Sequence, residues 1–210
     1  MNPRFVITGT DTDIGKTIFS AALTAALDAY YWKPVQAGLD EETDSEIVAR
    51  LGAHHGSKIW PEKYRLKIPA SPHFAAAQEG VCLSADQLSI PDVPGPLVIE
   101  GAGGALVPLN DQLLYADLFA QWNQPVILVA STRLGTINHS LLTIEALNHR
   151  KVPIWGIAFI GDEVIDSQNT ICRIGRVKNL GRLPMLSDLT ADNLSKAFSR
   201  HFKRDDFIAA

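Results

Sequence analysis

Short apolar runs alternate with amphipathic helical patterns along most of this chain. The apolar runs predict buried strands at residues 5–7, 30–35, 97–99, 126–130 and 154–160, with a further strand ending at 181–184. The helical periodicity predicts helices at 15–29, 43–51, 137–150 and 191–202, and one more between residues 160 and 181. Because the strands are apolar on both faces, the pattern favours an α/β fold whose parallel sheet is covered by helices on each side.

Residues 53–96 interrupt this alternation. They are irregular and rich in proline, and only Pro72 to Gln78 has a helical pattern. No repeat, low-complexity segment or linker divides the chain, and 210 residues suit one domain. We therefore expect a single domain over residues 1–210.

Composition excludes several classes of function. The net charge is −4 with no basic run, which argues against binding nucleic acid. No stretch approaches the roughly 20 apolar residues that span a bilayer, and the first residues do not resemble a signal peptide. Cys82 and Cys172 lack the spacing of metal ligands, and His54-His55 is interpreted as a solvated loop pair. We expect a cytoplasmic protein with reduced thiols that binds no membrane.

A glycine-rich segment lies between the first predicted strand and the first predicted helix. It reads Gly-Thr-Asp-Thr-Asp-Ile-Gly-Lys-Thr over residues 9–17. Gly9 and Gly15 allow a tight turn that exposes backbone N–H groups, and the following helix directs its positive dipole end at the same place. Lys16 adds a positive charge, and the Thr17 hydroxyl is suited to ligate Mg²⁺. The segment predicts a phosphate-binding loop.

This loop departs from the usual pattern. Five residues separate its glycines instead of four, and Asp11 and Asp13 are acidic. Carboxylates beside a phosphate repel it, so we interpret one of them as a group that accepts a proton or hydrogen bond from an amine substrate. The alternative is a plain glycine turn with Asp13 at the start of the helix.

Other strand ends carry reactive side chains, and in parallel sheets ligands bind at the carboxyl ends of the strands. Lys33 precedes Pro34, which holds it extended, so we expect an exposed lysine that projects from a strand end. Glu100 follows an apolar strand and precedes glycines, which fits a magnesium ligand. Asp44 is a further candidate ligand, although the residues alone favour an ordinary helix-start acid.

The segment 131–139 follows the clearest apolar strand. Thr136 or Asn138 is expected to begin the next helix and to offer free N–H groups to an anion. His139 is interpreted as a surface residue of that helix rather than a catalytic one.

Five collinear segments together resemble the ATP-dependent dethiobiotin synthetases. They are residues 9–17, Lys-Pro-Val at 33–35, Ser-Pro-His at 71–73 with Ala-Gln-Glu-Gly at 77–80, Glu-Gly-Ala-Gly-Gly at 100–104, and Leu-Gly-Thr-Ile-Asn-His at 134–139. The five-residue spacing in the phosphate loop is typical of this family. The resemblance implies a P-loop NTPase-like domain that acts as a homodimer.

The resemblance also implies a ligase of biotin biosynthesis. Such an enzyme uses ATP, Mg²⁺ and CO₂ to close the ureido ring of dethiobiotin on 7,8-diaminopelargonate through a carbamic–phosphoric anhydride. Its chemistry needs anions held together and spreading charge stabilised, rather than a general base.

Carried over by motif, the resemblance assigns residues to roles. The catalytic residues are Thr12, Lys16 and Lys33. The magnesium ligands are Thr17, Asp44 and Glu100. The ATP-binding residues are Asp13, Ile14, Gly15, Lys16, Thr17, Ile18, Asp44, Glu100, Gly101, Ala102, Gly103, Ile160, Gly161, Pro184, Met185 and Leu186. The substrate-binding residues are Thr12, Lys33, Ala37, Gly135 and Asn138, the last two across the dimer interface.

Two positions depart from the family pattern. Ala37 stands where a substrate-binding serine is common, so Gln36 is a candidate to replace that hydrogen bond. Ile160 stands where an asparagine often reads adenine, and its side chain has neither donor nor acceptor. We therefore expect relaxed nucleotide choice, with adenine selectivity resting on backbone groups.

The main alternative is a partitioning or positioning ATPase of the same superfamily. Those switch proteins carry a lysine near the start of the phosphate loop, where this chain has Thr-Asp-Thr-Asp. They also need a membrane-seeking helix or a basic surface. The segment from Phe198 to Phe207 is mixed in charge and is interpreted as a frayed helix. A relative without catalytic activity, suggested by Ala37 and Ile160, is another alternative.

Overall fold

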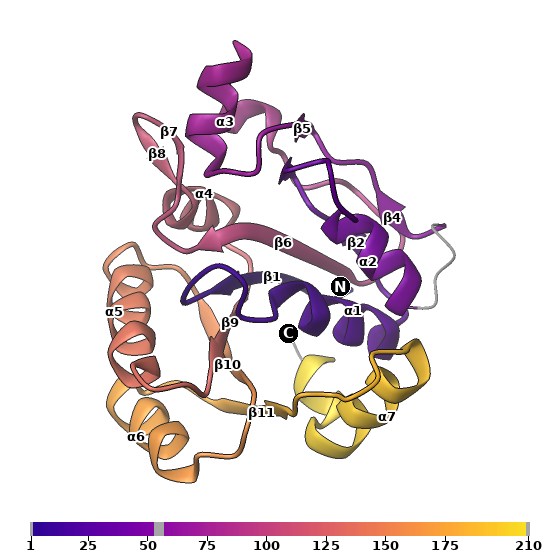
Figure 1. The fold of residues 1–210 in the computed structure, drawn as a ribbon. Helices are drawn as coiled ribbons and strands as arrows, with labels where there is room; N and C mark the ends of the chain where they lie inside the picture. The colour runs from indigo at the N-terminus through magenta and orange to yellow at the C-terminus, as the bar shows by residue number, and fades with distance from the viewer. Residues whose placement is uncertain (1, 53–56, 209–210) are drawn as a thin grey trace.

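A seven-stranded parallel sheet forms the centre of the computed structural model, which describes residues 2–52 and 57–208 (Figure 1). The strand order is β11-β10-β9-β1-β6-β2-β4, and the paired strands of this sheet all run parallel. The bounds are β1 Arg4–Gly9, β2 Tyr30–Trp32, β4 Ile59–Trp60, β6 Leu97–Gly104, β9 Val126–Ser131, β10 Ile154–Ile160 and β11 Asn179–Leu183. The predicted α/β class with a parallel sheet is confirmed.

Helices cover both faces of the sheet, as Figure 1 shows. Their bounds are α1 Lys16–Leu27, α2 Asp44–Leu51, α3 Pro72–Glu79, α4 Tyr115–Trp122, α5 Thr136–His149, α6 Ile165–Gly175 and α7 Ala191–His201, with 3₁₀ turns η1 Ala85–Gln87 and η2 Arg204–Phe207. One core places Phe5 and Ile7 of β1 with Phe19 of α1. The next residue along β1, Val6, belongs to a second core with Phe119 of α4. The alternation of strand side chains thus fills both faces.

The strand predicted over residues 30–35 is confirmed at 30–32 and wrong beyond, because the chain leaves the sheet at Lys33-Pro34. β2 ends at Trp32, and Val35–Ala37 forms β3, which pairs with β5 (Tyr64–Leu66) in a separate two-stranded sheet. Proline has no N–H to continue the ladder. The Pro34 carbonyl instead accepts hydrogen bonds from the N–H groups of Lys63 and Tyr64. The lysine of interest therefore sits at a break between two sheets.

Other boundaries also differ from the prediction. The described part of 53–96 holds β4, β5, α3 and η1, where only one helix was expected. β6 continues past Glu100 through Gly104, where Gly104 pairs with Gly9 of β1 after a shift in register. The short hairpin of β7 (Pro108–Asn110) and β8 (Leu113–Leu114) and the helix α4 had no counterpart in the prediction. The His54-His55 pair lies outside the described residues.

The C-terminal segment is not a frayed helix, which corrects the expectation for Phe198–Phe207. Phe198 and Phe202 are stacked at 4.7 Å between ring centroids, and both are buried with Phe207 against Phe19. A β-bridge between Phe202 and Gly181 ties this end to the edge strand β11. No described helix is long and apolar enough to cross a membrane.

Candidate active site

The predicted phosphate loop leaves β1 at Gly9 and enters α1 at Lys16. Gly15 is the N-cap of α1 with φ 93°, a left-handed conformation that favours glycine, and no side chain caps the helix. The first N–H groups of α1 are therefore not taken up by a capping side chain, as an anion site requires. Gly9 is equally constrained, because a Cβ there would lie 2.7 Å from the Ile14 side chain.

Lys16 folds back over this loop. Its ammonium donates a hydrogen bond to the Asp11 carbonyl at 2.8 Å, and the side chain is buried. Asp11 in turn accepts a hydrogen bond from the Thr12 N–H through its carboxylate at 2.7 Å. Burial lowers the pKa of Lys16, and nearby Lys33 lowers it further while Glu100 opposes the shift. A phosphate would relieve this desolvation by pairing with the ammonium.

Beside the loop, side chains from α1, α2 and β6 converge with Lys33, which lies between β2 and β3. Lys33 Nζ lies 2.6 Å from Asp44 Oδ2 and 3.3 Å from Glu100 Oε1. Thr17 Oγ1 lies 2.5 Å from Asp44 Oδ1 and 2.9 Å from Glu100 Oε1. Glu100 is fully buried and Lys33 is 3% exposed. The expectation of an exposed Lys33 is therefore wrong, although the residues that it was expected to accompany do surround it.

Strand register explains why Lys33 meets Glu100. β2 pairs with β6 so that Tyr31 lies opposite Val98 and Trp32 opposite Ile99. One residue further along, Lys33 comes opposite Glu100. The break at Pro34 then allows the lysine to turn in, where it also lies 3.4 Å from the Gly101 carbonyl.

Asp44 is the first residue of α2, yet it is not the residue that caps the helix. Thr43 and Glu46 form a reciprocal capping box, with the Glu46 carboxylate on the Thr43 N–H at 2.8 Å. Asp44 is thus spared from capping, and its carboxylate points to Thr17 and Lys33. Asp44 is therefore a helix-start acid, as the residues alone suggested, and it also contacts Thr17 and Lys33.

The charges of the cluster stabilise one another. Burial alone would lower the pKa of Lys33, but the Glu100 and Asp44 carboxylates outweigh it and raise the pKa well above its ordinary value. Burial alone would raise the pKa of Asp44, but Lys33 and the Thr17 hydroxyl hold it below its usual range. The lysine therefore stays cationic and Asp44 stays anionic near neutral pH.

Tyr31 belongs to the cluster and was missed by the sequence reasoning. Its hydroxyl donates a hydrogen bond to Glu100 Oε2 at 3.0 Å, and the residue is fully buried. Burial raises the pKa of Tyr31 well above its ordinary value, and the Glu100 and Asp44 carboxylates add to the shift, so the hydroxyl keeps its proton. The sequence did hold a signal for Tyr31. Side chains two residues apart in an extended chain point to the same face, so Tyr31 shares a face with Lys33.

The glycines after Glu100 line the other side of the loop. Gly104 is paired with Gly9 across β6 and β1. Gly103 has φ 65°, and a Cβ there would lie 2.8 Å from Val107 and 3.5 Å from the Thr12 hydroxyl. Glycine is therefore required at position 103 by its φ and by Val107, and Thr12 lies at ordinary contact distance from the same position.

The predicted adenine-binding residues lie at the ends of β10 and β11 and just after them. The side chain of Ile160 packs on the phosphate loop, since a Cβ at Gly15 would lie 3.0 Å from it. The Ile160 carbonyl accepts from the Thr132 N–H at 3.0 Å, and the Gly161 N–H donates to the Leu183 carbonyl at 3.0 Å. The Gly161 N–H is thus used within the sheet. Pro184, Met185 and Leu186 follow β11, and Met185 is exposed.

Gln36 is not free to replace the missing serine at position 37. Its amide nitrogen lies 3.2 Å from the Ala37 carbonyl and 3.3 Å from the Gly38 carbonyl, and its amide oxygen accepts from the Asp44 N–H at 3.3 Å. Gln36 therefore shapes the turn before α2. Both amide contacts of the nitrogen are made within the turn, and the substrate-binding role considered for Gln36 stays a prediction.

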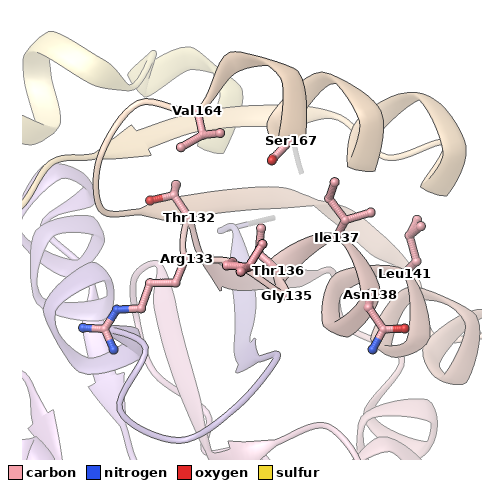
Figure 2. Close-up of a pocket in the computed structure, with 10 residues that line it drawn as sticks. Thr132, Arg133, Gly135, Thr136, Ile137, Asn138, Leu141, Val164 and Ser167 are labelled. Carbon is pink, nitrogen blue, oxygen red and sulfur yellow. The ribbon is translucent and has the colours of Figure 1, made fainter.

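We call Thr17, Lys33, Asp44 and Glu100 the lysine cluster. Gly135 and Asn138 lie apart from it. They line a pocket of about 700 Å³ between the N-terminal ends of α5 and α6, in which Val164, the N-cap residue of α6, and Ser167 of α6 face Thr132 across the opening (Figure 2). Gly135 is the N-cap of α5 with φ 95° and no side-chain cap. Helix α5 begins at Thr136, one of the two expected starts. None of the residues that line this pocket belongs to the phosphate loop, and the exposed Leu134 is among them.

The proposed magnesium ligands fit a hard divalent cation. Thr17, Asp44 and Glu100 offer one hydroxyl and two carboxylates, with Thr17 Oγ1 within 2.9 Å of both acids. Among the described residues, no three or more His, Cys, Asp or Glu side chains are placed so that they could hold a metal ion by themselves. Two carboxylates completed by phosphate and water are the usual arrangement for Mg²⁺. The ammonium of Lys33 already occupies a cation position between the two acids.

Comparison with known proteins gives a consistent result. A family model described as an AAA domain matches residues 3–193. Among curated relatives, the ATP-dependent dethiobiotin synthetase of Rhodopseudomonas palustris (strain HaA2) is 56% identical over 99% of this chain and 98% of its own length. The corresponding proteins of Agrobacterium fabrum and Brucella melitensis are each 58% identical, again over 99% of this chain and 98% of their own.

Solved structures agree at the level of the fold. A ParA family ATPase from Chlorobium tepidum has a TM-score of 0.52 at 9% identity, over 97% of this chain and 92% of that one. The MinC:MinD complex of Aquifex aeolicus gives 0.51 at 12% identity, over 93% and 86%. These low identities support the P-loop NTPase-like fold alone. The full-length sequence identities settle the family: this chain belongs to the ATP-dependent dethiobiotin synthetases.

Proposed function

We propose that this protein carboxylates 7,8-diaminopelargonate with CO₂ and closes the ureido ring of dethiobiotin at the expense of ATP. The observation that carries the proposal is the convergence of Thr17, Lys33, Asp44 and Glu100 at the mouth of the phosphate loop. Two lysines, two acids and a helix N-terminus match a reaction that joins several anions. The family membership supports the same assignment.

The residues divide the chemistry between them. One substrate amine adds to CO₂ and gives a carbamate, whose oxygen attacks the γ-phosphorus while ADP leaves. The second amine then attacks the carbamic carbon of the mixed anhydride, and phosphate leaves. Lys16 is proposed to hold the β- and γ-phosphates, and Lys33 to hold the carbamate and the transferred phosphoryl group. Thr12 and Asp13 face the substrate side of the loop, where an acid favours an amine.

Mg²⁺ is proposed to bind Thr17, Asp44 and Glu100. When bound, it would neutralise charge on the β- and γ-phosphate oxygens. The protein supplies three oxygens for this purpose. The Thr17 hydroxyl oxygen already lies within hydrogen-bond distance of one carboxylate oxygen of Asp44 and one of Glu100. Ile14, Gly15 and Ile18, with Gly101 to Gly103, would surround the phosphates, and Pro184 to Leu186 would border the adenine.

The substrate tail is proposed to bind at the N-terminus of α5 in a homodimer. The uncapped N–H groups after Gly135 suit a carboxylate. Because Gly135 and Asn138 line a pocket separate from the lysine cluster, we propose that they serve the site of the partner subunit. We place the enzyme in the cytoplasm, in keeping with two cysteines that form no disulfide.

The direct test mixes the purified protein with diaminopelargonate, ¹³C-bicarbonate, Mg²⁺ and ATP. Mass spectrometry should find dethiobiotin heavier by one unit than the product from ordinary bicarbonate. Phosphate release should depend on the diamine. A protein that hydrolyses ATP equally fast without the diamine, and gives no ureido product, would favour the partitioning-type ATPase instead.

A further inference from the structure

The two oxygens of the Glu100 carboxylate have different neighbours. Oε1 faces the site, 2.9 Å from the Thr17 hydroxyl and 3.3 Å from the Lys33 ammonium. Oε2 faces away and accepts the hydroxyl of Tyr31 at 3.0 Å. Both Glu100 and Tyr31 are fully buried. The tyrosine hydroxyl therefore sits behind the carboxylate, on the side opposite Thr17 and Lys33.

The fold fixes the position of that hydroxyl. Tyr31 lies opposite Val98 in the β2–β6 pair, and Glu100 follows two residues later on the same face of β6. The ring of Tyr31 packs in the core that α1 and α2 cover, with Val98 and Val48 among its members. A ring held in a close-packed core has little freedom to move. Its hydroxyl therefore donates to the Glu100 carboxylate from a fixed position.

A buried carboxylate oxygen requires a partner, since leaving it without one is costly. Without the tyrosine hydroxyl, Oε2 would have to find one by turning the carboxylate. The groups available on the site side are Thr17 and Lys33, which Oε1 already uses. The orientation of Glu100 thus depends on Tyr31.

We propose that Tyr31 is a positioning residue, which holds Glu100 so that a single carboxylate oxygen faces the bound divalent cation. This inference rests on the proposed function, in which Glu100 is a magnesium ligand. Mg²⁺ demands near-ideal octahedral geometry, whereas Ca²⁺ accepts carboxylates through one oxygen or two. The hydroxyl should therefore matter more for Mg²⁺ than for Ca²⁺.

The test is the variant Tyr31→Phe, which keeps the ring and removes only the hydroxyl. Calorimetry measures the affinity for a non-hydrolysable ATP analogue without metal, with Mg²⁺ and with Ca²⁺. We expect the metal-free affinity to be unchanged and the gain from Mg²⁺ to fall about tenfold, the size expected for a hydrogen bond to a charged group. The gain from Ca²⁺ should fall less. Circular dichroism confirms that the variant is folded.

Tyr30→Phe is the matched control. Tyr30 lies on the same strand but its ring faces Lys58 and Gly95, away from Glu100. It should leave both metal gains unchanged. In a Glu100→Gln background, Tyr31→Phe should have no further effect on the gain from Mg²⁺, because the carboxylate that it positions is gone.

Two results would overturn the inference. One is a Tyr31→Phe variant that responds to Mg²⁺ like Tyr30→Phe. The other is an equal loss in the wild-type and Glu100→Gln backgrounds, which marks a general effect on the fold. Either result, in a wild-type protein that forms the ureido product, leaves the proposed function standing. A wild-type protein that forms no product and gains nothing from Mg²⁺ would remove both.

Discussion

The ammonium of Lys33 lies 2.6 Å from Oδ2 of Asp44, one of the two carboxylates proposed to bind magnesium. It also lies 3.3 Å from the second, Glu100. Lys33 thus neutralises the buried Glu100 and the partly exposed Asp44 in the metal-free protein. A divalent cation that takes these acids would release the ammonium toward the phosphates. Metal binding and the positioning of Lys33 are coupled in this arrangement.

Removing this lysine should affect both activity and stability. We expect Lys33→Ala to lose turnover at least about a hundredfold, since a charge that stabilises the transferred phosphoryl group disappears. In the presence of a chelator the variant should also lose about 3 kcal/mol of stability, because the buried Glu100 carboxylate is left without its cation and the partly exposed Asp44 loses the same partner. The stability effect follows from the burial of Lys33, which the sequence analysis expected to be exposed.

Thermal unfolding with EDTA and with Mg²⁺ checks this prediction. Mg²⁺ should restore more stability to Lys33→Ala than to the wild type, because the metal replaces the missing charge. Lys63→Ala, at a lysine outside the site, serves as the control and should show no such difference. Normal turnover in a folded Lys33→Ala protein would remove Lys33 from the mechanism.

Nucleotide choice should be relaxed. Ile160 offers no hydrogen-bonding side chain, and the Gly161 N–H is used by Leu183. Selection by shape alone discriminates far less than a site with matched donors and acceptors. We expect steady-state rates with ATP, CTP and GTP that agree within roughly tenfold. A preference for ATP of several thousandfold would show that the 184–186 segment reads adenine closely.

The start of α4 should be sensitive to acid. Partial burial alone would raise the pKa of Asp117, but the Leu114 N–H at 2.9 Å and the Arg150 guanidinium at 2.7 Å hold it below its usual value. A carboxylate with a lowered pKa in the folded state stabilises the protein above its unfolded pKa, and this contribution is lost as the pH falls through the folded pKa.

Urea unfolding of Asp117→Asn across a pH series tests this. The variant should be about 1 kcal/mol less stable than the wild type at pH 7. The difference should shrink below about pH 4, where the carboxyl of the unfolded chain becomes protonated, and vanish as the pH falls through the lower folded pKa. Asp111→Asn, at an exposed position on the neighbouring hairpin, should show no difference at any pH. A constant gap between Asp117→Asn and wild type would contradict the prediction.

The C-terminal aromatic cluster should carry a large share of the stability. Phe207 is fully buried and contacts the rings of Phe5, Phe19, Phe198 and Phe202. Phe207→Ala should cost about 3–5 kcal/mol, as large-to-small changes in a core do. Ile208→Ala, one residue on and 46% exposed, should cost less than about 1 kcal/mol. Equal unfolding temperatures for the two variants would mean that this end of the chain is not packed in solution.

The sequence predicted the parts of this protein that depend on local order. The phosphate loop is a contiguous motif, and Lys33 and Glu100 follow apolar strands whose ends meet at one edge of the sheet. The hydroxyl of Tyr31 was missed because its partner is 69 residues away and becomes a neighbour only through the β2–β6 pairing. The break at Pro34 was missed because a short apolar run does not reveal where a ladder stops.

The C-terminal segment was misread for a related reason. Its charged residues suggest a solvated helix, whereas Phe198 and Phe202 are one helical turn apart and share a face. Phe207 completes the cluster only because η2 folds the chain back toward Phe5 and Phe19. Composition records the mixture of residue types, but only the tertiary arrangement decides which side of the helix is buried.

The Thr17–Glu100 contact joins residues 83 positions apart, and this spacing has a consequence during protein synthesis. A nascent chain emerging from the ribosome carries the phosphate loop early, but it lacks Glu100, an acid of the proposed cation site, until the sixth strand has been translated. Under the proposed function, nucleotide and magnesium would therefore stabilise only chains that have already assembled the centre of the sheet.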